Sequence, residues 1–216
     1  SSANAVAIQP DGKIVAVGGA VLSDQEYQAL ARYNADGTLD RSFGNRGKVV
    51  TKVGSFSDAV GVFVQTDAKL IVAGNGALVR YGADGKIDLG WGRGGKVLDG
   101  VRHVSAVAMQ RDRKLVTAGT GMGPHYPKFS LGRFLEDGSR DESFGRPGKL
   151  LADFGTKGVG NAVVVRADGT IVVTGTVGGR DFALAGYGNN GRLDGRFGRG
   201  GKVVTDFGSI WAMRGR

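Results

Sequence analysis

The stretch RYNADGTLDRSFGNRGKVV, residues 32–50, decides the fold because variants of it recur three more times along the chain. The other copies are RYGADGKIDLGWGRGGKVL (80–98), RFLEDGSRDESFGRPGKLL (133–151) and GYGNNGRLDGRFGRGGKVV (186–204). Every copy carries an aromatic residue followed by Gly, at Phe43, Trp91, Phe144 and Phe197. A Gly-Lys pair then follows, whose lysines are Lys48, Lys96, Lys149 and Lys202. Four copies in 216 residues give a repeat of about 54 residues.

A second pattern precedes each copy and completes the repeat. It reads NAVAIQPDGKIVAVG from Asn4, DAVGVFVQTDAKLIVAG from Asp58, SAVAMQRDRKLVTAG from Ser105 and NAVVVRADGTIVVTG from Asn161. Small and β-branched residues predict a strand on each side of the Asp11-Gly12 turn, a dipeptide typical of hairpins. Two further strands are expected at residues 29–34 and 48–53, and no segment has a sustained helical period.

Four short strands per unit, joined by Gly-marked hairpins, are typical of a β-propeller blade. We therefore predict an all-β fold: a propeller of four four-stranded antiparallel blades, with no helix longer than about two turns. A β-solenoid is the alternative, although its repeats are usually shorter and lack this antiparallel meander. The expected blades cover residues 1–54, 55–100, 101–156 and 157–208, so that residues 1–208 form one domain and residues 209–216 a C-terminal tail.

The combined pattern NAVAIQPDGKIVAVG…ALARYNADGTLDRSFGNRGKVVT resembles the delta-60 repeat, a propeller-forming bacterial repeat. The resemblance covers all four units, although Asp67-Ala68-Lys69 and Asp112-Arg113-Lys114 replace Asp-Gly-Lys in the second and third. Because this family typically occurs in large exported bacterial proteins, the resemblance implies an exported bacterial protein, in the periplasm, at the cell surface or outside the cell. It implies no particular activity.

The composition excludes several classes of protein and site. The chain has 40 glycines without a Gly-X-Y period, no cysteine, and only two histidines, His103 and His125. Collagen, disulfide-stapled domains, thiolate metal sites and His-rich metal sites are therefore excluded. No apolar run is long enough to predict a transmembrane segment. The net charge of +9 favours acidic partners.

The repeated aromatic residues have two interpretations. We expect Phe43, Trp91, Phe144 and Phe197 to be structural anchors of blade packing, because each unit of a repeat protein buries one face against its neighbour. The alternative is a ring of platforms on which ligands stack. The two interpretations differ in the burial that they predict for the four rings.

Asn34, Asp36 and Asp40 have the spacing with which a calcium loop begins, and they form a weak calcium candidate. No bidentate Glu follows at the twelfth position, and Asp or Asn before Gly also forms turns without a metal ion. We therefore predict no metal and no cofactor. The Gly-rich segments before the repeated lysines resemble phosphate loops, but they lead into strands instead of helices, which argues against a nucleotide site.

The same Gly-rich segments place one arginine at an equivalent position in every unit. A ring of equivalent cations suits a polyanion. The predicted basic ring consists of Arg46, Arg93, Arg146 and Arg199. Acidic residues alternate with these cations, including Asp40, Asp88, Asp141 and Asp194, so a solvated turn of mixed charge is the other interpretation.

The loop between the second and third strands differs in every unit. In a propeller this loop and the connection between blades emerge on the same face, where insertions often mark a binding surface. The binding-face candidates are Tyr27, Arg102, His103, His125, Tyr126, Phe129, Lys157, Arg180 and Asp181. Aromatic and cationic side chains together suit sugars, carboxylates or a protein, whereas simple drift of unconstrained loops would produce the same variation.

These features favour a non-enzymatic, exported binding or structural module that contacts a protein partner or a multi-subunit assembly. The chain contains neither a G-x-S-x-G nor an H-E-x-x-H motif. A lectin-like module for acidic glycans or another polyanion is the alternative, and nucleic acid is a less suitable partner. An enzyme with a site on the propeller axis is a third class, which would have to use Gln9, Gln65, Gln110 and Arg166.

Each predicted blade is one contiguous unit, so no strand is borrowed from the other terminus. We therefore expect the ring to close through side-chain packing between the first and fourth blades. The tail SIWAMRGR, residues 209–216, carries Trp211 and Met213, and we expect it to dock on a blade edge or on a partner. A frayed end is the alternative.

Overall fold

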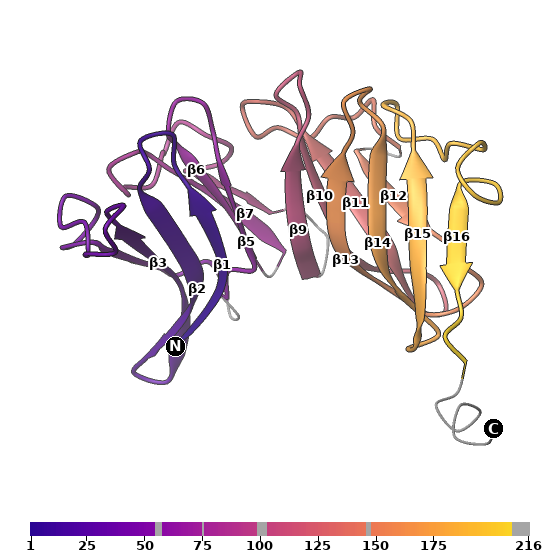
Figure 1. Ribbon diagram of the computed structural model, residues 1–216, viewed down its shortest axis with the longest axis horizontal. Coiled ribbons are helices and arrows are strands. Elements are labelled where there is room, and N and C mark those ends of the chain that lie inside the picture. Colours follow the sequence, from indigo (N-terminus) through magenta and orange to yellow (C-terminus); the bar gives the residue numbers. More distant parts are fainter. Residues whose placement is uncertain (55–57, 75, 99–102, 146–147, 209–216) are drawn as a thin grey trace.

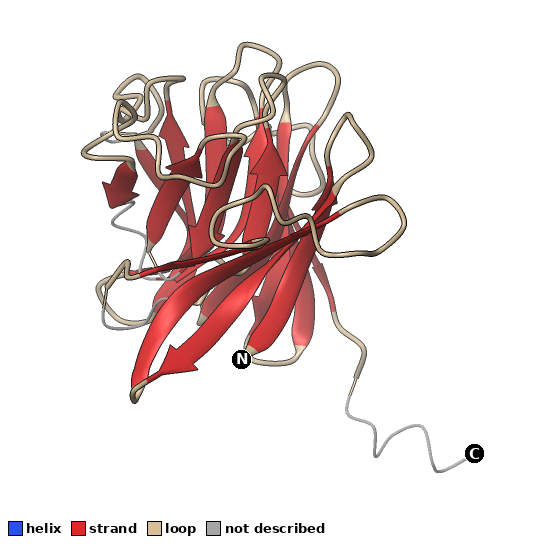
Figure 2. Cartoon of the chain, turned by 90° about the vertical axis from the view of Figure 1, so that its left-hand side faces the viewer, coloured by secondary structure: helices blue, strands red, loops and turns tan. Residues whose placement is uncertain are grey.

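The computed structural model describes residues 1–54, 58–74, 76–98, 103–145 and 148–208. These residues form four antiparallel four-stranded sheets, each built from one contiguous unit (Figure 1). Within the described ranges there is no helix (Figure 2), and hence none long and apolar enough to cross a membrane. The predicted all-β fold of four four-stranded antiparallel propeller blades is confirmed.

The strands follow one another in the same order in every blade. Blade one contains β1 (Ser2–Ile8), β2 (Ile14–Leu22), β3 (Gln25–Tyr33) and β4 (Lys48–Thr51). Blade two contains β5 (Gly61–Val64), β6 (Leu70–Gly74), β7 (Ala77–Tyr81) and β8 (Lys96–Leu98). Blade three contains β9 (His103–Met109), β10 (Leu115–Met122), β11 (Pro127–Phe134) and β12 (Lys149–Ala152). Blade four contains β13 (Gly158–Val165), β14 (Ile171–Val177), β15 (Asp181–Tyr187) and β16 (Lys202–Thr205).

The turn between the first two strands keeps its form even where the sequence departs from Asp-Gly. Gly12 adopts a left-handed φ of 81°, and Ala68 and Arg113 adopt 62° and 63° at the same place. A left-handed φ costs a residue with a Cβ about 1–2 kcal/mol. The Asp of each turn accepts the backbone N–H two residues on, at Lys69 and Lys114, so this local hydrogen bond holds the turn.

The Gly that ends each repeated second-strand pattern, such as Gly18 in NAVAIQPDGKIVAVG, is required because the backbone of the preceding strand passes too close for a Cβ. A Cβ placed on Gly18 would lie 2.0 Å from the carbonyl oxygen of Ser2 on the neighbouring strand. The register between β1 and β2 shifts at this place, between Ala3 and Ala5. A Cβ on Gly119 or Gly175 would meet the first strand of its own blade in the same way, and a Cβ on Gly74 would meet Asp58, which precedes β5. The register shifts at this place in blades one, three and four, so the Gly permits a bulge in these three blades.

The hydrophobic cores lie between consecutive blades. Val15, Val17 and Leu30 of blade one pack with Leu70 and Val72 of blade two. Equivalent clusters join blade two to blade three and blade three to blade four. The first strands β1, β5, β9 and β13 are successive neighbours along one side of the molecule. Each blade is therefore stabilised mainly by the blades beside it, as in other repeat proteins.

The four blades form an open arc. Blades one and four lie at opposite ends of the molecule in Figure 1, and the first strands pack β1 on β5, β5 on β9 and β9 on β13. Over the described residues, the prediction that blades one and four pack against each other is therefore wrong. One flank of each terminal blade has no neighbour in the arc. The predicted docking of the tail concerns residues 209–216, which lie outside the described residues.

Candidate functional site

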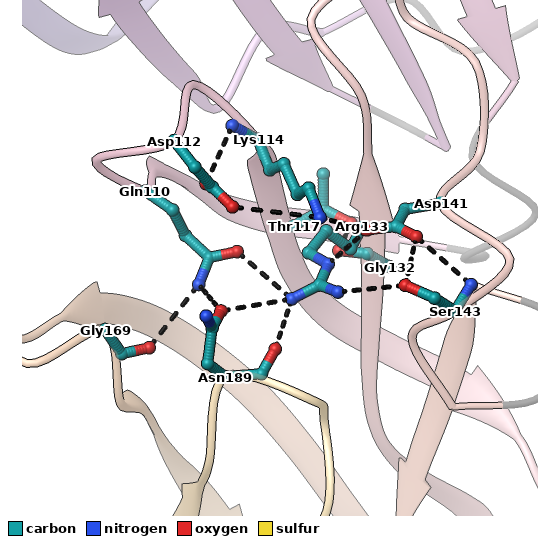
Figure 3. A network of polar contacts seen from close by, with 10 residues as sticks. All are labelled: Gln110, Asp112, Lys114, Thr117, Gly132, Arg133, Asp141, Ser143, Gly169 and Asn189. Carbon is teal, nitrogen blue, oxygen red and sulfur yellow. Dashed lines mark hydrogen bonds and ion pairs between the residues drawn. The ribbon is translucent and has the colours of Figure 1, made fainter.

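A buried Arg–Asp–Lys cluster lies at the end of the third strand, and Figure 3 shows it in blade three. Arg133 is on β11, and Asp141 follows in the connection to β12. The Arg133 Nε donates to Asp141 Oδ2 at 2.8 Å, and Lys114 Nζ lies 3.1 Å from the same oxygen. The backbone N–H and the hydroxyl of Ser143 donate to the other oxygen, Oδ1. The carboxylate is therefore fully surrounded by donors.

The same guanidinium fastens blade three to blade four. Arg133 Nη1 donates to the backbone carbonyl of Asn189, in the connection between β15 and β16 (Figure 3). Gln110 donates through Nε2 to Asn189 Oδ1 at 2.8 Å and to the carbonyl oxygen of Gly169 at 3.4 Å. The polar groups of two blades thus satisfy one another across the interface, which indicates a structural role for the cluster.

The cluster keeps its carboxylates ionised. Burial raises the pKa of Asp141, but hydrogen bonds from Ser143 and Lys114 outweigh burial and lower the pKa from 3.8 to about 2. In blade one the pKa of Asp40 is also lowered, chiefly by the hydrogen bond from Ser42. General acid–base catalysis works best with a pKa near the operating pH. The low pKa values therefore suit these carboxylates to holding blades together and not to transferring protons at neutral pH.

The cluster is repeated in two other blades and altered in the last. The same residue types form it in blade one (Arg32, Asp40, Lys13) and in blade two (Arg80, Asp88, Lys69). In blade four, Gly186 stands at the position of the arginine, and Arg166 stands at the position of Gln110. The Arg166 guanidinium carbon lies 5.8 Å from the centroid of the Phe197 ring. Blade four therefore supplies its cation from the residue that follows its first strand, β13, instead of from the third strand.

The aromatic anchors lie beside these arginines. Phe43, Trp91 and Phe144 are buried, each within 5.4 Å of the guanidinium carbon of its own blade's arginine. Each ring also packs on a turn glycine of the following blade; these glycines are Gly85, Gly138 and Gly191. Phe197 has no following blade in the arc and is half-buried. Three of the four rings are thus enclosed between blades, where no ligand reaches their faces.

The third-strand arginines are not among the predicted site residues, although the sequence contains a signal for them. In three units an arginine precedes an aspartate by eight residues, as in Arg32 and Asp40 or Arg133 and Asp141. We interpreted these aspartates as members of a solvated turn of mixed charge. That interpretation is wrong for Asp40 and Asp141, which are buried. Each carboxylate accepts a hydrogen bond from the arginine on the third strand of its own blade, and this contact keeps it away from solvent.

The predicted basic ring is exposed where the structure describes it. Arg46, Arg93 and Arg199 are exposed, and Arg146 lies outside the described residues. Arg93 borders a pocket of about 740 Å³ between blades two and three. Phe134 and Val97 contribute apolar surface to this pocket, and Arg140 contributes a second guanidinium. The lining also contains Lys96 and one carboxylate, that of Asp137, so cations outnumber acidic groups and the pocket suits a ligand that carries an acidic group.

The prediction that Phe129 belongs to the binding face is wrong. The segment around it was interpreted as a loop, but β11 begins at Pro127 and the Phe129 side chain is fully buried. Its ring lies 4.9 Å from that of Phe154, and a Cβ on Gly158 of blade four would lie 3.1 Å from it. Phe129 therefore packs between blades and takes no part in a binding face.

The other candidates are distributed over several blades. His103, His125, Lys157 and Arg180 are exposed, Tyr27, Tyr126 and Asp181 are half-buried, and Arg102 lies outside the described residues. Tyr126 donates its hydroxyl to Asp153 Oδ1 at 3.0 Å, and this hydrogen bond raises the pKa of Tyr126. Tyr27 lies under Lys52, whose Nζ is 5.3 Å from the ring centroid. These contacts hold individual loops, and within the described ranges no hydrogen bond, ion pair or ring contact joins one candidate to another across blades.

The calcium candidates Asn34, Asp36 and Asp40 are engaged in hydrogen bonds and ion pairs at two different places. Asp36 Oδ1 accepts from the backbone N–H and the hydroxyl of Thr38, and Asn34 Nδ2 donates to the same hydroxyl. Asp40 is instead part of the Arg–Asp–Lys cluster. Among the described residues, no group of three or more His, Cys, Asp or Glu side chains is placed to hold a metal ion.

Blade one exposes a face that the other blades bury. We call it the upstream face, and it is defined by Val6, Ile8, Ile14, Ala16 and Tyr33. Val6 and Ile8 are 65% and 70% exposed, and the other three are half-buried. The counterparts of Ile14 and Tyr33 in blades two to four are at most 2% exposed: Leu70, Leu115, Ile171, Tyr81, Phe134 and Tyr187.

Blade four exposes the opposite face. We call it the downstream face, and it is defined by Val164, Val172, Thr174, Phe182 and Phe197. Val164 and Phe182 are 58% and 54% exposed. The counterparts of Val172 and Thr174 in blades one to three are at most 2% exposed: Val15, Ile71, Val116, Val17, Ala73 and Ala118. The two end faces are therefore the two halves of a blade–blade interface, each without its partner.

Comparison with known proteins is consistent with this architecture. Residues 9–43 match the family model described as a domain of unknown function, DUF5122, beta-propeller. No curated protein matches the chain. A solved protein of unknown function from Bacteroides caccae is similar over 88% of this chain, with a TM-score of 0.55 and 11% sequence identity. The chain covers 64% of that protein, less than two thirds of its length, and at this identity the likeness shows the fold alone. The repeat is thus similar to β-propeller repeats in both sequence and fold.

Proposed function

We propose that the chain is a non-enzymatic structural module that binds a protein partner through its two end faces, as part of a larger assembly. The observation that carries this proposal is that apolar positions on the terminal blades of this chain are more exposed than their counterparts at the interior interfaces. A soluble protein rarely leaves a contiguous apolar surface of this kind uncovered unless another molecule binds there.

The energetics favour a covered state. Burying one large aliphatic side chain that is otherwise exposed contributes about 1.5–3 kcal/mol. Val6 and Ile8 on the upstream face and Val164 and Phe182 on the downstream face are each more than half exposed. A partner that buries all four gains several such contributions, which offset the entropy lost on association.

The polar clusters support the non-enzymatic part of the proposal. The recurring arginines and aspartates pair with each other within a blade, as Arg133 and Asp141 do, and the arginine also donates to the next blade, as Arg133 does to Asn189. Their carboxylates have pKa values far below neutrality. The repeated arginines and aspartates are therefore explained by their role in stabilising the blades.

Site-specific photo-crosslinking tests the proposal. Benzoylphenylalanine is introduced at Val6 or at Val164, and the protein is irradiated in cells of its source organism. We expect protein adducts at both positions. Leu89, which is exposed but lies on neither end face, is the matched control and should form few adducts. Absence of adducts at both face positions, or equal yields at Leu89, would contradict the proposal.

A lectin-like function is the second candidate, and the pocket beside Arg93 and Arg140 favours it. The expected ligand is an acidic glycan whose carboxylate or sulfate pairs with the two guanidinium groups. A glycan array followed by a salt titration tests this function, because polyanion binding weakens steeply with ionic strength. Arg93→Ala should reduce binding to acidic glycans, and equal binding by the variant and the wild type would exclude the pocket.

The proposal includes export from a bacterial cell and membership of the delta-60 repeats. Its support is the sequence resemblance, which covers all four units of the chain. Fractionation of the source organism, followed by immunoblotting, tests the location. Recovery of the protein with the periplasm, the cell surface or the medium is expected, and recovery with cytoplasmic markers would contradict this part of the proposal.

A further inference from the structure

We infer that a second pocket, between blades two and three, binds a neutral sugar through its hydroxyl groups. This pocket has a volume of about 540 Å³ and shares only Asp137 with the pocket beside Arg93. Its lining includes Gln65, Lys69 and Arg80 of blade two and Met109, Arg113 and Glu136 of blade three. Both sides of the pocket belong to interior blades, so the inference is independent of the end faces and goes beyond the proposed function.

A serine hydroxyl completes the Arg–Asp–Lys cluster in blades one and three. Ser143 Oγ donates to Asp141 Oδ1 at 2.6 Å and accepts from Arg133 Nη2 at 3.4 Å (Figure 3). Ser42 makes the same two hydrogen bonds in blade one. In both blades the hydroxyl thus joins the carboxylate to the guanidinium, acting as donor and acceptor at once.

Blade two carries a glycine at the position of this serine, and this residue, Gly90, lines the pocket. Asp88 Oδ1 accepts the backbone N–H of Gly90 at 3.3 Å, and the glycine has no hydroxyl to add a second hydrogen bond. Arg80 Nη2 lies 2.9 Å from the other oxygen, Oδ2, and carries two hydrogens. The Asp88 side chain is 20% exposed, against 8% for Asp40 and 6% for Asp141. The carboxylate and the guanidinium of blade two are therefore open to a ligand hydroxyl.

The indole of Trp91 competes with Arg80 for a carbonyl oxygen of blade three. Trp91 Nε1 donates to the carbonyl oxygen of Glu136 at 3.0 Å, and Arg80 Nη1 reaches the same oxygen only at 3.5 Å. At the preceding interface, Arg32 Nη1 reaches the equivalent oxygen, that of Ala83, at 2.6 Å. The phenylalanine at the anchor position of blades one and three has no N–H, so it leaves this carbonyl to the arginine. The polar contact between blades two and three is therefore looser than the one between blades one and two.

Gln65 contributes a buried acceptor to the pocket. It lines the pocket and is only 8% exposed, and among the described residues its Oε1 has no hydrogen-bond partner. The equivalent oxygens of Gln9 and Gln110 accept hydrogen bonds from Arg32 and Arg133. A buried polar atom without a partner is rare in folded proteins and is destabilising. A ligand hydroxyl in the pocket can donate to this oxygen once the Gln65 amide turns toward it.

The charges of the lining favour an uncharged ligand over an ion. Three cations and three carboxylates line the pocket: Lys69, Arg80 and Arg113 against Asp67, Glu136 and Asp137. They also pair with one another, as Arg113 does with Glu136 at 2.8 Å, so neither an anion nor a cation meets an excess of opposite charge. A sugar hydroxyl both donates and accepts, as the serine hydroxyl does in the other blades. One hydroxyl of the sugar therefore takes the place of that serine at Asp88, and a neighbouring hydroxyl meets Gln65.

Restoring the serine fills the site in a way that the fold tolerates. A Cβ on Gly90 would meet only Asp88 Oδ1, at 3.6 Å, and the φ of Gly90 is not left-handed. Gly90→Ser therefore places a hydroxyl between Asp88 and Arg80, as in blades one and three. Leu89→Ser is the matched control, because it adds the same hydroxyl one residue away, at an exposed position outside the pocket lining.

Heteronuclear NMR of the full chain, titrated with the methyl glycosides of glucose, galactose and mannose, measures the binding. At least one glycoside should shift the backbone amide of Gly90 and the side-chain amide of Gln65, in the wild type and in Leu89→Ser alike. Gly90→Ser should weaken this binding more than about tenfold, because its hydroxyl occupies the two partners that the sugar hydroxyl would use. Thermal unfolding checks the fold, and Gly90→Ser should melt at or above the temperature of the wild type.

Three results would overturn the inference. If none of the three glycosides shifts the Gly90 and Gln65 amides, the pocket holds water only. If a glycoside binds the wild type and Gly90→Ser equally, the sugar does not use the place of the serine hydroxyl. If inorganic phosphate shifts these amides and no glycoside does, the ligand is an anion and not a neutral sugar. None of these results alters the photo-adducts expected at Val6 and Val164, so the proposed function is tested separately.

Discussion

Replacing Arg133 by Met tests whether the buried Arg–Asp–Lys cluster holds blades three and four together. Met preserves apolar contact with Phe144, whose ring centroid lies 4.4 Å from the guanidinium carbon. The substitution removes the hydrogen bonds from Arg133 to Asp141 and to the carbonyl of Asn189. It leaves the Asp141 carboxylate buried, with Lys114 3.1 Å away as the cation that remains beside it.

The expected loss in the free energy of unfolding follows from this geometry. Removing one member of a buried ion pair costs about 3–5 kcal/mol, chiefly because the other charge stays buried. Lys114 offsets part of that cost, so we expect about 3 kcal/mol at pH 7. In the wild type the pKa of Asp141 is lowered from 3.8 to about 2, which corresponds to about 2 kcal/mol. This contribution is complete above about pH 5 and is lost as the pH falls through 2.

Urea unfolding followed by far-UV circular dichroism measures both effects. The deficit of the Arg133→Met variant should be largest at pH 7 and should shrink at pH 2–3, where Asp141 becomes protonated. Arg196→Ala is the control, because Arg196 pairs with Asp194 at 3.2 Å but is almost fully exposed. Such a surface pair contributes at most about 1 kcal/mol. A deficit below 1 kcal/mol for Arg133→Met, or one that does not depend on pH, would refute the structural role of the cluster.

Three further predictions follow from individual contacts. Gly191→Ala should lower the melting temperature more than Gly37→Ala does. Both substitutions add left-handed strain (φ of 82° and 84°), but only a Cβ on Gly191 meets the Phe144 ring, at 2.8 Å, so equal shifts would contradict the packing role of that ring. Phe144→Ala should cost about 3–5 kcal/mol in urea unfolding and Phe197→Ala distinctly less, because Phe144 is buried and Phe197 only half-buried; similar costs would show that the two rings are packed alike. Asp153→Asn should bring the pKa of Tyr126 down toward its ordinary value in an ultraviolet titration, because the hydrogen bond to the Asp153 carboxylate raises it; an unchanged titration would exclude that hydrogen bond.

The sequence by itself determined the blades. Strand identity, the hairpin turns and the number of units depend on local chemistry that recurs along the chain, such as the Asp-Gly turns and the Gly at the end of each repeated second-strand pattern. The repeated aromatic position was also readable, because one buried ring per unit is what a stacked architecture requires. These features involve residues that are close in sequence or related by the period of the repeat.

Only the tertiary structure decided how the polar groups and the ends of the arc are used. Arg133 meets Asn189 from the next blade, and Phe129 is buried because its strand begins earlier than the loop pattern indicated. The arrangement of the blades in an arc likewise depends on how whole blade faces pack on one another, which no short segment encodes. Val6 and Val164 have the same residue type as buried positions elsewhere, and they are exposed because no blade lies beside them in the arc.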